Sequence, residues 1–595
     1  MKEKRITNPF RWFALVSASV ACAFALAGCT GNSAESSSED TAVATYADID
    51  NMDLAYTDHD KDASYDEASA TKIILDGESA QVEGTGAQVE GAKVTIDAAG
   101  TYVISGELAD GQVCVNVAET DKVQVVLAGA QIHNETGAAL FVEQADKCFI
   151  TLAEGTENKL SDGADYSFAE GEDEPDATLF SKDDVTINGT GSLAVTANYS
   201  DAIASKDNLT ITGGTYNISA KEDGLRGKDS LKILDGTFTV EAGEDCLKSS
   251  RDDDPTKGFV CIDGGTFELN AGDDAVHGET YLRVTKGDIT VPTCNEGLEA
   301  MVVQVDDGNI QIASEDDALN AAAPSASSDQ NASDEIPEGA LGQEQQGGEE
   351  GQLPQRPNAQ DSAQTPPDLP SGDRPEPPEG SEAQQPNGSE PASNANRSEQ
   401  QQPPAANGNK AQQPPTGSDE QQPSAQNDQQ PQQPNTSTTQ GQSQPGGAEE
   451  GNESCKIIIN GGTIRLEAKG DAIDSNGSLT INGGTIFVTG PTSNGDGALD
   501  YALDAACNGG TLLIVGSAGM AQDFTSSAQP SAFIQVKGVA DQEIIVADQA
   551  GAELFSYTPS ASYETVIVSS PDFEDGKEYS LIIGSATTTF TATTK

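Results

Sequence analysis

The protein is a chain of 595 residues with 97 acidic and 31 basic side chains, so its formal net charge is −66. This excess of acid argues against nucleic acid as a partner, because phosphate binding requires clustered Lys and Arg, and it favours cations. Only three His are present and they lie far apart, which argues against a His-rich zinc site or a Ser-His-Asp hydrolase.

Residues 1–28 have the order of a secretory signal: basic residues, an apolar run from Trp12 to Ala27, then small residues. The run is too short and too rich in Ala for a transmembrane helix. Its end, Leu26-Ala27-Gly28-Cys29, resembles a bacterial lipobox, in which the cysteine is lipidated and becomes the mature N-terminus. We therefore expect a lipid anchor at Cys29 on the extracellular face of the bacterial cell envelope. A plain cleaved signal with a coincidental cysteine is the alternative.

Residues 29–70 read as an acidic tether and N-terminal segment. Within them Asp58, Asp60 and Asp62 have EF-hand-like spacing, but Ala63 and Ser69 stand where the loop glycine and the bidentate glutamate belong. A solvated turn is the competing interpretation.

Seven other cysteines remain after the signal, and none forms a CxxC pair. An odd number cannot all pair within one chain, so at least one is free or intermolecular. Small buried residues are the expected role for most of them. They are Cys114, Cys148, Cys246, Cys261, Cys294, Cys455 and Cys507.

A repeat of about 22 residues runs through the middle of the chain, for example ITGGTYNISAKEDGL from Ile211 and ILDGTFTVEAGEDCL from Ile233. Each copy has a Gly turn, an alternating strand, an acidic residue, a small residue and an aliphatic. Alternation between Gly turns predicts strands, and aliphatics at a fixed phase predict one buried column per position. The sequence therefore predicts an all-β fold, a right-handed parallel β-helix. Tyr216 and Phe238 share the phase of core aliphatics, so we expect them to be buried.

The predicted helix has an N-terminal cap and first coils in 71–323, last coils in 453–510 and a β cap in 511–595. Residues 324–452 contain 20 of the 28 prolines, together with many Gln, Asn and Ser, and are predicted to be disordered. The repeat phase continues across this insertion, which predicts a loop that leaves and re-enters one solenoid. Closing a loop of that length costs only about 2.6 kcal/mol more than closing a short one.

One acidic residue per repeat is expected to line a corner of the solenoid. Neighbouring coils lie about 4.8 Å apart, where two unit charges repel by roughly 0.9 kcal/mol in water and about 3.5 at an effective dielectric of 20. Hard oxygen ligands at this spacing fit Ca²⁺. Two alternatives stay open: the carboxylates cap the turn backbone, or neighbouring Lys and Arg neutralise them. The corner acids are Asp201, Asp223, Asp245, Asp274, Glu296 and Asp317, and a second column contains Asp207 and Asp229.

Several segments resemble a family of secreted bacterial carbohydrate-binding β-helix proteins, among them TDHDKDASYDEASATKI, ADKCFITLAEGTENKLSDG, LFSKDDVTINGTGSL and GSAGMAQ. The resemblance covers nearly all of the mature chain outside the insertion. It implies a pectate-lyase-like fold, bound Ca²⁺, and binding of acidic plant-type polysaccharide and cellulose without established catalysis. The matching acids would be its cation ligands: Asp201, Asp207, Asp223, Asp229, Asp245 and Asp274.

We therefore expect a monomeric, non-catalytic surface protein that binds uronate-rich polysaccharide through protein-bound Ca²⁺. One alternative is a Ca²⁺-dependent polysaccharide lyase, which would need a base of lowered pKa such as Arg226, Lys228, Lys248 or Arg251 beside the metal. Another is an adhesin or scaffold in which the insertion is the working part.

Overall fold

The computed structural model describes residues 43–168, 171, 174–324 and 451–595. The predicted signal, lipidation site and almost all of the predicted disordered insertion lie outside these residues. The described residues on both sides of 325–450 belong to one compact unit. Among them, no helix is long and apolar enough to cross a membrane.

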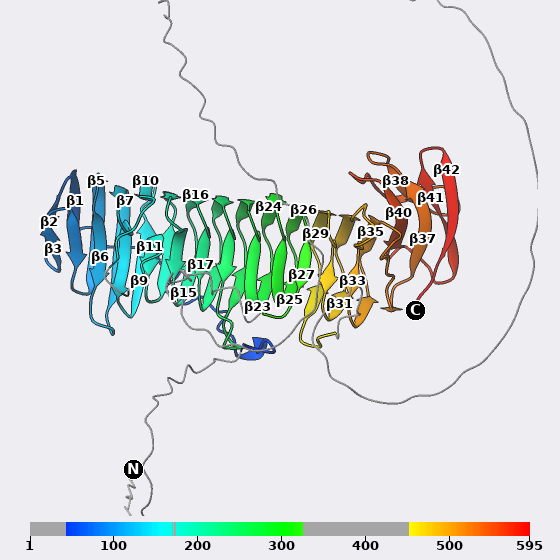
Figure 1. Ribbon diagram of the computed structural model, residues 1–595, viewed down its shortest axis with the longest axis horizontal. Helices are drawn as coiled ribbons and strands as arrows, with labels where there is room; N and C mark the ends of the chain where they lie inside the picture. Colours follow the sequence, from blue (N-terminus) through cyan, green and yellow to red (C-terminus); the bar gives the residue numbers. More distant parts are fainter. Residues whose placement is uncertain (1–42, 169–170, 172–173, 325–450) are drawn as a thin grey trace, which may run out of the picture. The chain divides into compact units, whose positions relative to one another are not determined.

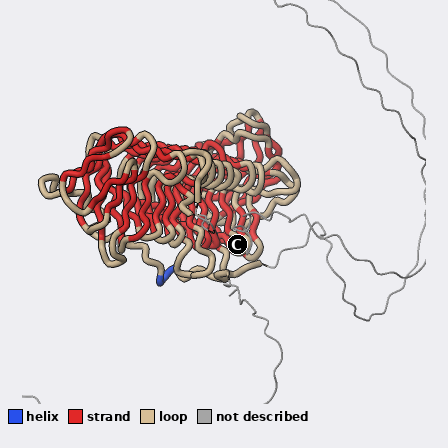
Figure 2. The backbone as a smooth tube through the Cα atoms, turned by 60° about the vertical axis from the view of Figure 1, so that its left-hand side comes forward, coloured by secondary structure: helices blue, strands red, loops and turns tan. Residues whose placement is uncertain are grey.

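The chain winds into a parallel β-helix whose coils each contribute strands to three sheets (Figures 1 and 2). In each sheet, hydrogen bonds join a strand to its equivalent one coil earlier and one coil later, so every strand edge within the stack is paired. Gly turns separate the strands, and the alternation within each strand buries one set of side chains. The predicted fold class is confirmed.

Sheet 1 follows the corner acids. Its strands are β4 (Lys93–Ile96), β6 (Gln112–Asn116), β8 (Leu140–Gln144), β11 (Ala177–Ser181), β14 (Asp201–Ser205), β17 (Leu225–Gly227), β20 (Leu247–Ser249), the first parts of β23 (Val276–Val284) and β25 (Leu298–Val305), β27 (Leu319–Ala321), β30 (Asp474–Ser475) and β33 (Asp500–Tyr501).

Sheet 2 follows in the chain. Its strands are β1 (Thr71–Gly77), β5 (Gly100–Leu108), β7 (Lys122–Asn134), β9 (Lys147–Leu152), β12 (Val185–Gly189), β15 (Asn208–Ile211), β18 (Ser230–Ile233), β21 (Phe259–Ile262), the second parts of β23 and β25, β28 (Lys456–Ile459), β31 (Ser478–Ile481), β34 (Asp504–Cys507) and β36 (Ser526–Ser527).

Sheet 3 completes each coil. Its strands are β10 (Glu157–Asp162), β13 (Ser192–Ala197), β16 (Thr215–Ala220), β19 (Thr237–Ala242), β22 (Thr266–Asn270), β24 (Asp288–Cys294), β26 (Asn309–Ser314), β29 (Thr463–Ala468), β32 (Thr485–Thr489) and β35 (Thr511–Gly516).

Antiparallel strands close both ends of the stack; the sequence predicted such a cap at the C-terminal end only. At the start, β2 (Ala80–Glu83) pairs with β1, and β3 (Ala87–Glu90) pairs with β4. At the end, β40 (Tyr563–Ser569) pairs with β35 and with β37 (Ser531–Gly538). A separate sheet then follows in the order β39 (Glu553–Tyr557), β38 (Ile544–Ala547), β41 (Lys577–Ile583) and β42 (Ala586–Ala592).

The coils continue directly across the insertion. Strands β25, β26 and β27 pair in parallel with β28, β29 and β30, although 325–450 separates them in the chain. The amide of Asp471 also donates to Oδ1 of Asp317 over 2.7 Å, which is the contact made elsewhere between successive coils. The chain therefore leaves the solenoid after β27 and re-enters the same solenoid at β28.

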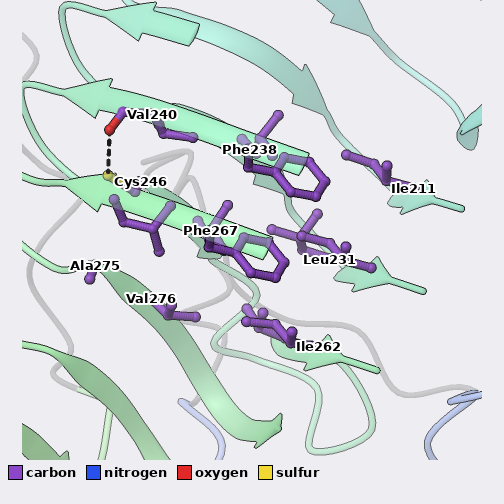
Figure 3. Close-up of a cluster of buried hydrophobic side chains, with 14 of the residues drawn as sticks. Ile211, Leu231, Phe238, Val240, Cys246, Ile262, Phe267, Ala275 and Val276 are labelled. Carbon is purple, nitrogen blue, oxygen red and sulfur yellow. Dashed lines mark hydrogen bonds between the residues drawn. The ribbon is translucent and has the colours of Figure 1, made fainter. Parts of the chain in front are cut away.

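The core consists of like side chains stacked coil on coil, as the repeat predicts (Figure 3). Tyr216, Phe238 and Phe267 are each 1% exposed, and successive ring centroids lie 4.7 Å apart with interplanar angles of 4° and 2°. At the acid corner of its coil Gly224 is required by space, because a Cβ there would lie 2.6 Å from the carbonyl oxygen of Cys246. All seven described cysteines are free and buried, which confirms their expected structural role.

The N-terminal segment from 43 to 66 contains the short 3-10 turn η1 (Ile49–Asn51). Its first part hydrogen-bonds to the loop after β20, through the amides of Ala44 and Asp48, and residues 53–64 contact the outer side of sheet 2. The buried carboxylate of Asp60 contacts Lys147 Nζ at 2.8 Å and accepts a hydrogen bond from Thr186 Oγ1. Lys232 Nζ donates to the carbonyl oxygens of Asp53 and Ala55. The carboxylate of Asp60 is thus engaged by side chains of the same chain, and the structure gives no support to the EF-hand-like alternative.

Candidate functional site

The corner acids stack on one another, one per coil, as predicted. Up to Asp274 each carboxylate caps the next coil: Asp223 N–H donates to Asp201 Oδ1 over 3.1 Å, Asp245 N–H to Asp223, and Asp274 N–H to Asp245. The capping resumes at Asp317, which accepts from Asp471 N–H. Among the described residues no such bond reaches Asp274 or Glu296 from the following coil. Corner carboxylates therefore cap the turn backbone before and after the Glu296 coil, and the capping bonds are interrupted at Asp274 and Glu296.

A second column explains how the first part of the corner tolerates its charge. This column is formed by the residue three positions after the corner acid of each coil. These residues lie on sheet 1, and consecutive coils place them in register. Read from β14 to β33 they are Ala204, Arg226, Lys248, His277, Glu299, Asn320, Asp474 and Asp500. The column changes from cationic to neutral and acidic residues after His277.

The cationic part neutralises the corner directly. Arg226 Nε donates to Asp201 Oδ2 over 2.6 Å and Nη2 donates to Asp176 over 2.7 Å. Lys248 Nζ lies 2.9 Å from Asp245 and 3.4 Å from Asp223. Burial disfavours both charges, but the surrounding carboxylates outweigh it and hold the pKa of Arg226 and of Lys248 above their ordinary values. The neutralisation alternative therefore describes Asp201, Asp223 and Asp245.

His277 is the last cation of this column. Its Nδ1 lies 2.8 Å from Asp274 Oδ2 and 3.2 Å from Glu299 Oε2, and its Nε2 lies 3.6 Å from Glu279. Burial opposes the imidazolium, but hydrogen bonds to these carboxylates raise the pKa of His277 well above its ordinary value. Its single charge faces three acids, so this coil carries an excess of negative charge.

The corner acids beyond His277 have no Lys or Arg partner in the described part of the chain. These acids are Glu296, Asp317 and Asp471, whereas Lys469 pairs with Glu315 instead. Burial and neighbouring carboxylates raise the pKa of Glu296 to about 7, of Asp317 to about 8 and of Asp471 to about 6. Raised carboxyl pKa values mean that their ionised forms are poorly stabilised by the protein alone.

A pocket of about 330 Å³ opens where the column changes sign. Its walls include Asp274, His277, Glu296 and Glu299, and carboxylate oxygens of Asp274, Glu296 and Glu299 lie within 4.8 Å of one another. Asn320 is 8% exposed; its Nδ2 donates to Glu296 Oε2 over 2.8 Å, while its Oδ1 is buried without a hydrogen-bond partner. Three carboxylates are the hard oxygen ligands that suit Ca²⁺, so Asp274, Glu296 and Glu299 fit that ion.

The predicted ligands therefore divide into groups. Asp274 and Glu296 meet at the pocket, and Asp245 joins Asp274 and His277 in a second group of possible ligands. Asp201 and Asp223 serve as caps and ion-pair partners, and Asp317 caps the coil beyond the pocket.

Two predicted ligands lie elsewhere. Asp207 and Asp229 follow the other end of the sheet 1 strands. Asp229 contacts Lys257 Nζ at 2.6 Å and lies 3.7 Å from Arg251. Neither aspartate belongs to the described groups of possible metal ligands.

Sequence reasoning did not assign Glu299, Asn320 or His277 to the site. The signal was present three residues after each corner acid, where Arg, Lys, His, Glu and Asn follow one another in successive repeats.

Comparisons with known proteins identify the family of the chain. Residues 90–330 match the family described as carbohydrate-binding domain-containing protein. A protein of that description from Acetivibrio thermocellus is 37% identical over 224 residues, which cover 37% of this chain and 78% of the relative. The chain belongs to this carbohydrate-binding family. A solved structure, the gadolinium derivative of a polysaccharide lyase-like protein from C. thermocellum, is 32% identical, with a TM-score of 0.36 over 41% of this chain and 95% of its own.

Proposed function

We propose that this carbohydrate-binding protein holds acidic, uronate-rich polysaccharide through Ca²⁺ bound at the pocket lined by Asp274, Glu296 and Glu299. The observation that carries the proposal is the gap in the corner column, where capping stops, protein cations end, and the amide oxygen of Asn320 is buried without a partner. Bound there, Ca²⁺ would supply open coordination positions for glycan carboxylates. Without such an ion, the net charge of −66 repels a polyanion.

The protein's own residues would divide the work. Asp274, Glu296 and Glu299 would supply carboxylate oxygens, and the amide group of Asn320 would orient Glu296. His277, which lines the same pocket, would hold Asp274 and Glu299 through its Nδ1.

We further propose that the protein is not an enzyme. Arg226 and Lys248 stand nearest the corner acids, but carboxylates engage both and raise their pKa. A lyase base needs the reverse shift, because it must be partly deprotonated at the working pH. A release of unsaturated uronate that requires Ca²⁺ and Arg226 would overturn this part of the proposal.

The decisive experiment is retention of an oligogalacturonate on the purified protein with added Ca²⁺ and with chelator. Binding is expected with Ca²⁺ and to fall by at least about tenfold in Glu296→Gln and in Glu299→Gln, because each removes a charged ligand. Glu268→Gln, an exposed glutamate on sheet 3, is the matched control and should bind like the wild type. Equal binding in chelator and Ca²⁺ would refute the calcium dependence.

We also propose attachment to the membrane through a lipid on Cys29. The support is the lipobox-like sequence Leu26-Ala27-Gly28-Cys29 behind a signal-like segment. Cys29→Ser should move the protein from the membrane fraction to the soluble fraction and abolish labelling by a fatty-acid analogue. Labelling that persists in this variant would refute the assignment.

A further inference from the structure

A groove lies on the outer side of sheet 3, in the coils that also carry the corner acids Glu296, Asp317 and Asp471. It consists of two adjoining hollows of about 220 and 240 Å³, which share Pro292, Ala313 and Glu467. Its floor is built from outward residues of β24, β26 and β29, with Thr290, Gln311 and Arg465 in register. The loop that contains Ser560 and Ala561, between β39 and β40, lines one side.

An irregularity in the solenoid shapes this groove. Between Val291 and Cys294 strand β24 contains one residue more than β26 has between Ile312 and Ser314, so the register shifts there. The extra residue is accommodated at Pro292 and Thr293, which are exposed beside the hollow. Such bulges re-aim side chains and end regular pairing locally. The groove is thus a local departure from an otherwise repetitive surface.

Arg465 is the unusual cation of this groove. Of the four arginines in the described residues, Arg226, Arg251 and Arg283 each pair with a carboxylate, whereas Arg465 forms no ion pair. Its guanidinium lies 5.1 Å from the ring centroid of Tyr557, and that ring stacks on Phe487 at 5.1 Å. The aromatic support orients the exposed guanidinium, whose planar donors remain available to a ligand.

Acceptors lie beside these donors. Glu467 is two residues further along β29 on the same face, and its Oε2 accepts a hydrogen bond from Ser560 Oγ over 2.8 Å. Gln311 and Thr290, both exposed, add groups that donate and accept. Pro292 and Ala313 add apolar surface. The groove carries both signs of charge, because Lys469 lines it as well and pairs with Glu315. Sugar hydroxyls, which both donate and accept, match this mixed set.

We propose that this groove is a binding site for a neutral pyranose unit of a polysaccharide, in which Arg465 and Glu467 bind hydroxyl groups and Pro292 contacts the C–H face. The proposal rests on the carbohydrate-binding function of the family and does not require the calcium site. Arg465 and Glu467 lie outside residues 90–330, the segment that matches the family.

The test is isothermal titration of the full chain, in detergent and chelator, with three probes: a β-1,4-glucose hexamer, a β-1,4-mannose hexamer and a galacturonate hexamer. At least one neutral hexamer is expected to bind. Arg465→Ala and Glu467→Ala should each weaken that binding by about tenfold, the effect of losing a hydrogen bond to a charged group. Lys537→Ala removes an exposed cation of the cap that pairs with Glu564, and should leave binding unchanged.

Three results would overturn the proposal. The first is that neither neutral hexamer binds in chelator; the second is that Arg465→Ala binds a neutral hexamer as tightly as the wild type. In the third, the galacturonate hexamer alone binds in chelator and depends on Arg465, which would make the ligand anionic. Unchanged melting of Arg465→Ala would show that lost binding reflects the site. The calcium proposal is tested separately, by the binding of the galacturonate hexamer to Glu296→Gln in Ca²⁺. It fails if this variant binds the hexamer as tightly as the wild type.

Discussion

The ion pairs of Arg226 with the corner acids allow a quantitative prediction. Arg226 has a side chain 16% exposed and contacts Asp201, which is 4% exposed, as well as Asp176. Replacing it by Ala leaves a buried carboxylate without its counter-charge. Breaking a buried pair in this way costs about 3–5 kcal/mol, whereas the exposed Lys469–Glu315 pair is worth less than about 1 kcal/mol.

Urea unfolding followed by circular dichroism measures the difference, with Lys469→Ala as the control. Asp201→Asn added to Arg226→Ala should restore part of the loss, because Asn keeps an oxygen for the Asp223 amide and removes the uncompensated charge. If Arg226→Ala loses no more stability than Lys469→Ala, protein cations do not support this part of the column.

Other regions make further predictions. Without divalent metal, stability should fall as pH rises from about 5 to 8, because the folded-state pKa values of Asp317, Glu296 and Asp471 lie above those of the unfolded chain, near 4, and folding therefore favours bound protons. Melting temperatures in chelator should show this slope and Ca²⁺ should flatten it; a rise with pH would contradict the assignment. Asp60→Ala should release the N-terminal segment and make it sensitive to limited proteolysis, because Lys147 and Thr186 lose their common partner; unchanged protection would contradict this. The seven buried thiols should react with Ellman's reagent only after unfolding, and rapid reaction of the native protein would refute their burial.

Much of the fold could be predicted from the sequence because each coil repeats the same requirements. Gly turns, alternating strands and a small residue at a crowded corner recur at one phase, so Tyr216 and Phe238 could be placed in the core without a structure. The same phase identified the corner acids and showed that the solenoid continues beyond the insertion. The cysteines followed from their small size and lack of pairing motifs.

The site was only partly predictable, because neighbouring coils decide what each acid does. Asp223 and Glu296 occupy the same place in the repeat, but Arg226 and Lys248 neutralise Asp223, whereas Glu296 faces Glu299 and Asn320. The N-terminal segment was missed as a covering of sheet 2, because the contact of Asp60 with Lys147 and Thr186 joins residues far apart in the chain. The groove at Arg465 depends on a bulge and on the C-terminal cap, which have no repeat to reveal them.

Calcium titration of the metal-free protein tests the central claim most directly, with melting recorded for the wild type, Glu296→Gln and Glu268→Gln. The account predicts that Ca²⁺ raises the melting temperature of the wild type and of Glu268→Gln, and that Glu296→Gln loses most of this rise. A melting temperature that Ca²⁺ leaves unchanged, or one that rises equally in Glu296→Gln, would contradict the placement of the ion at the gap in the acid column.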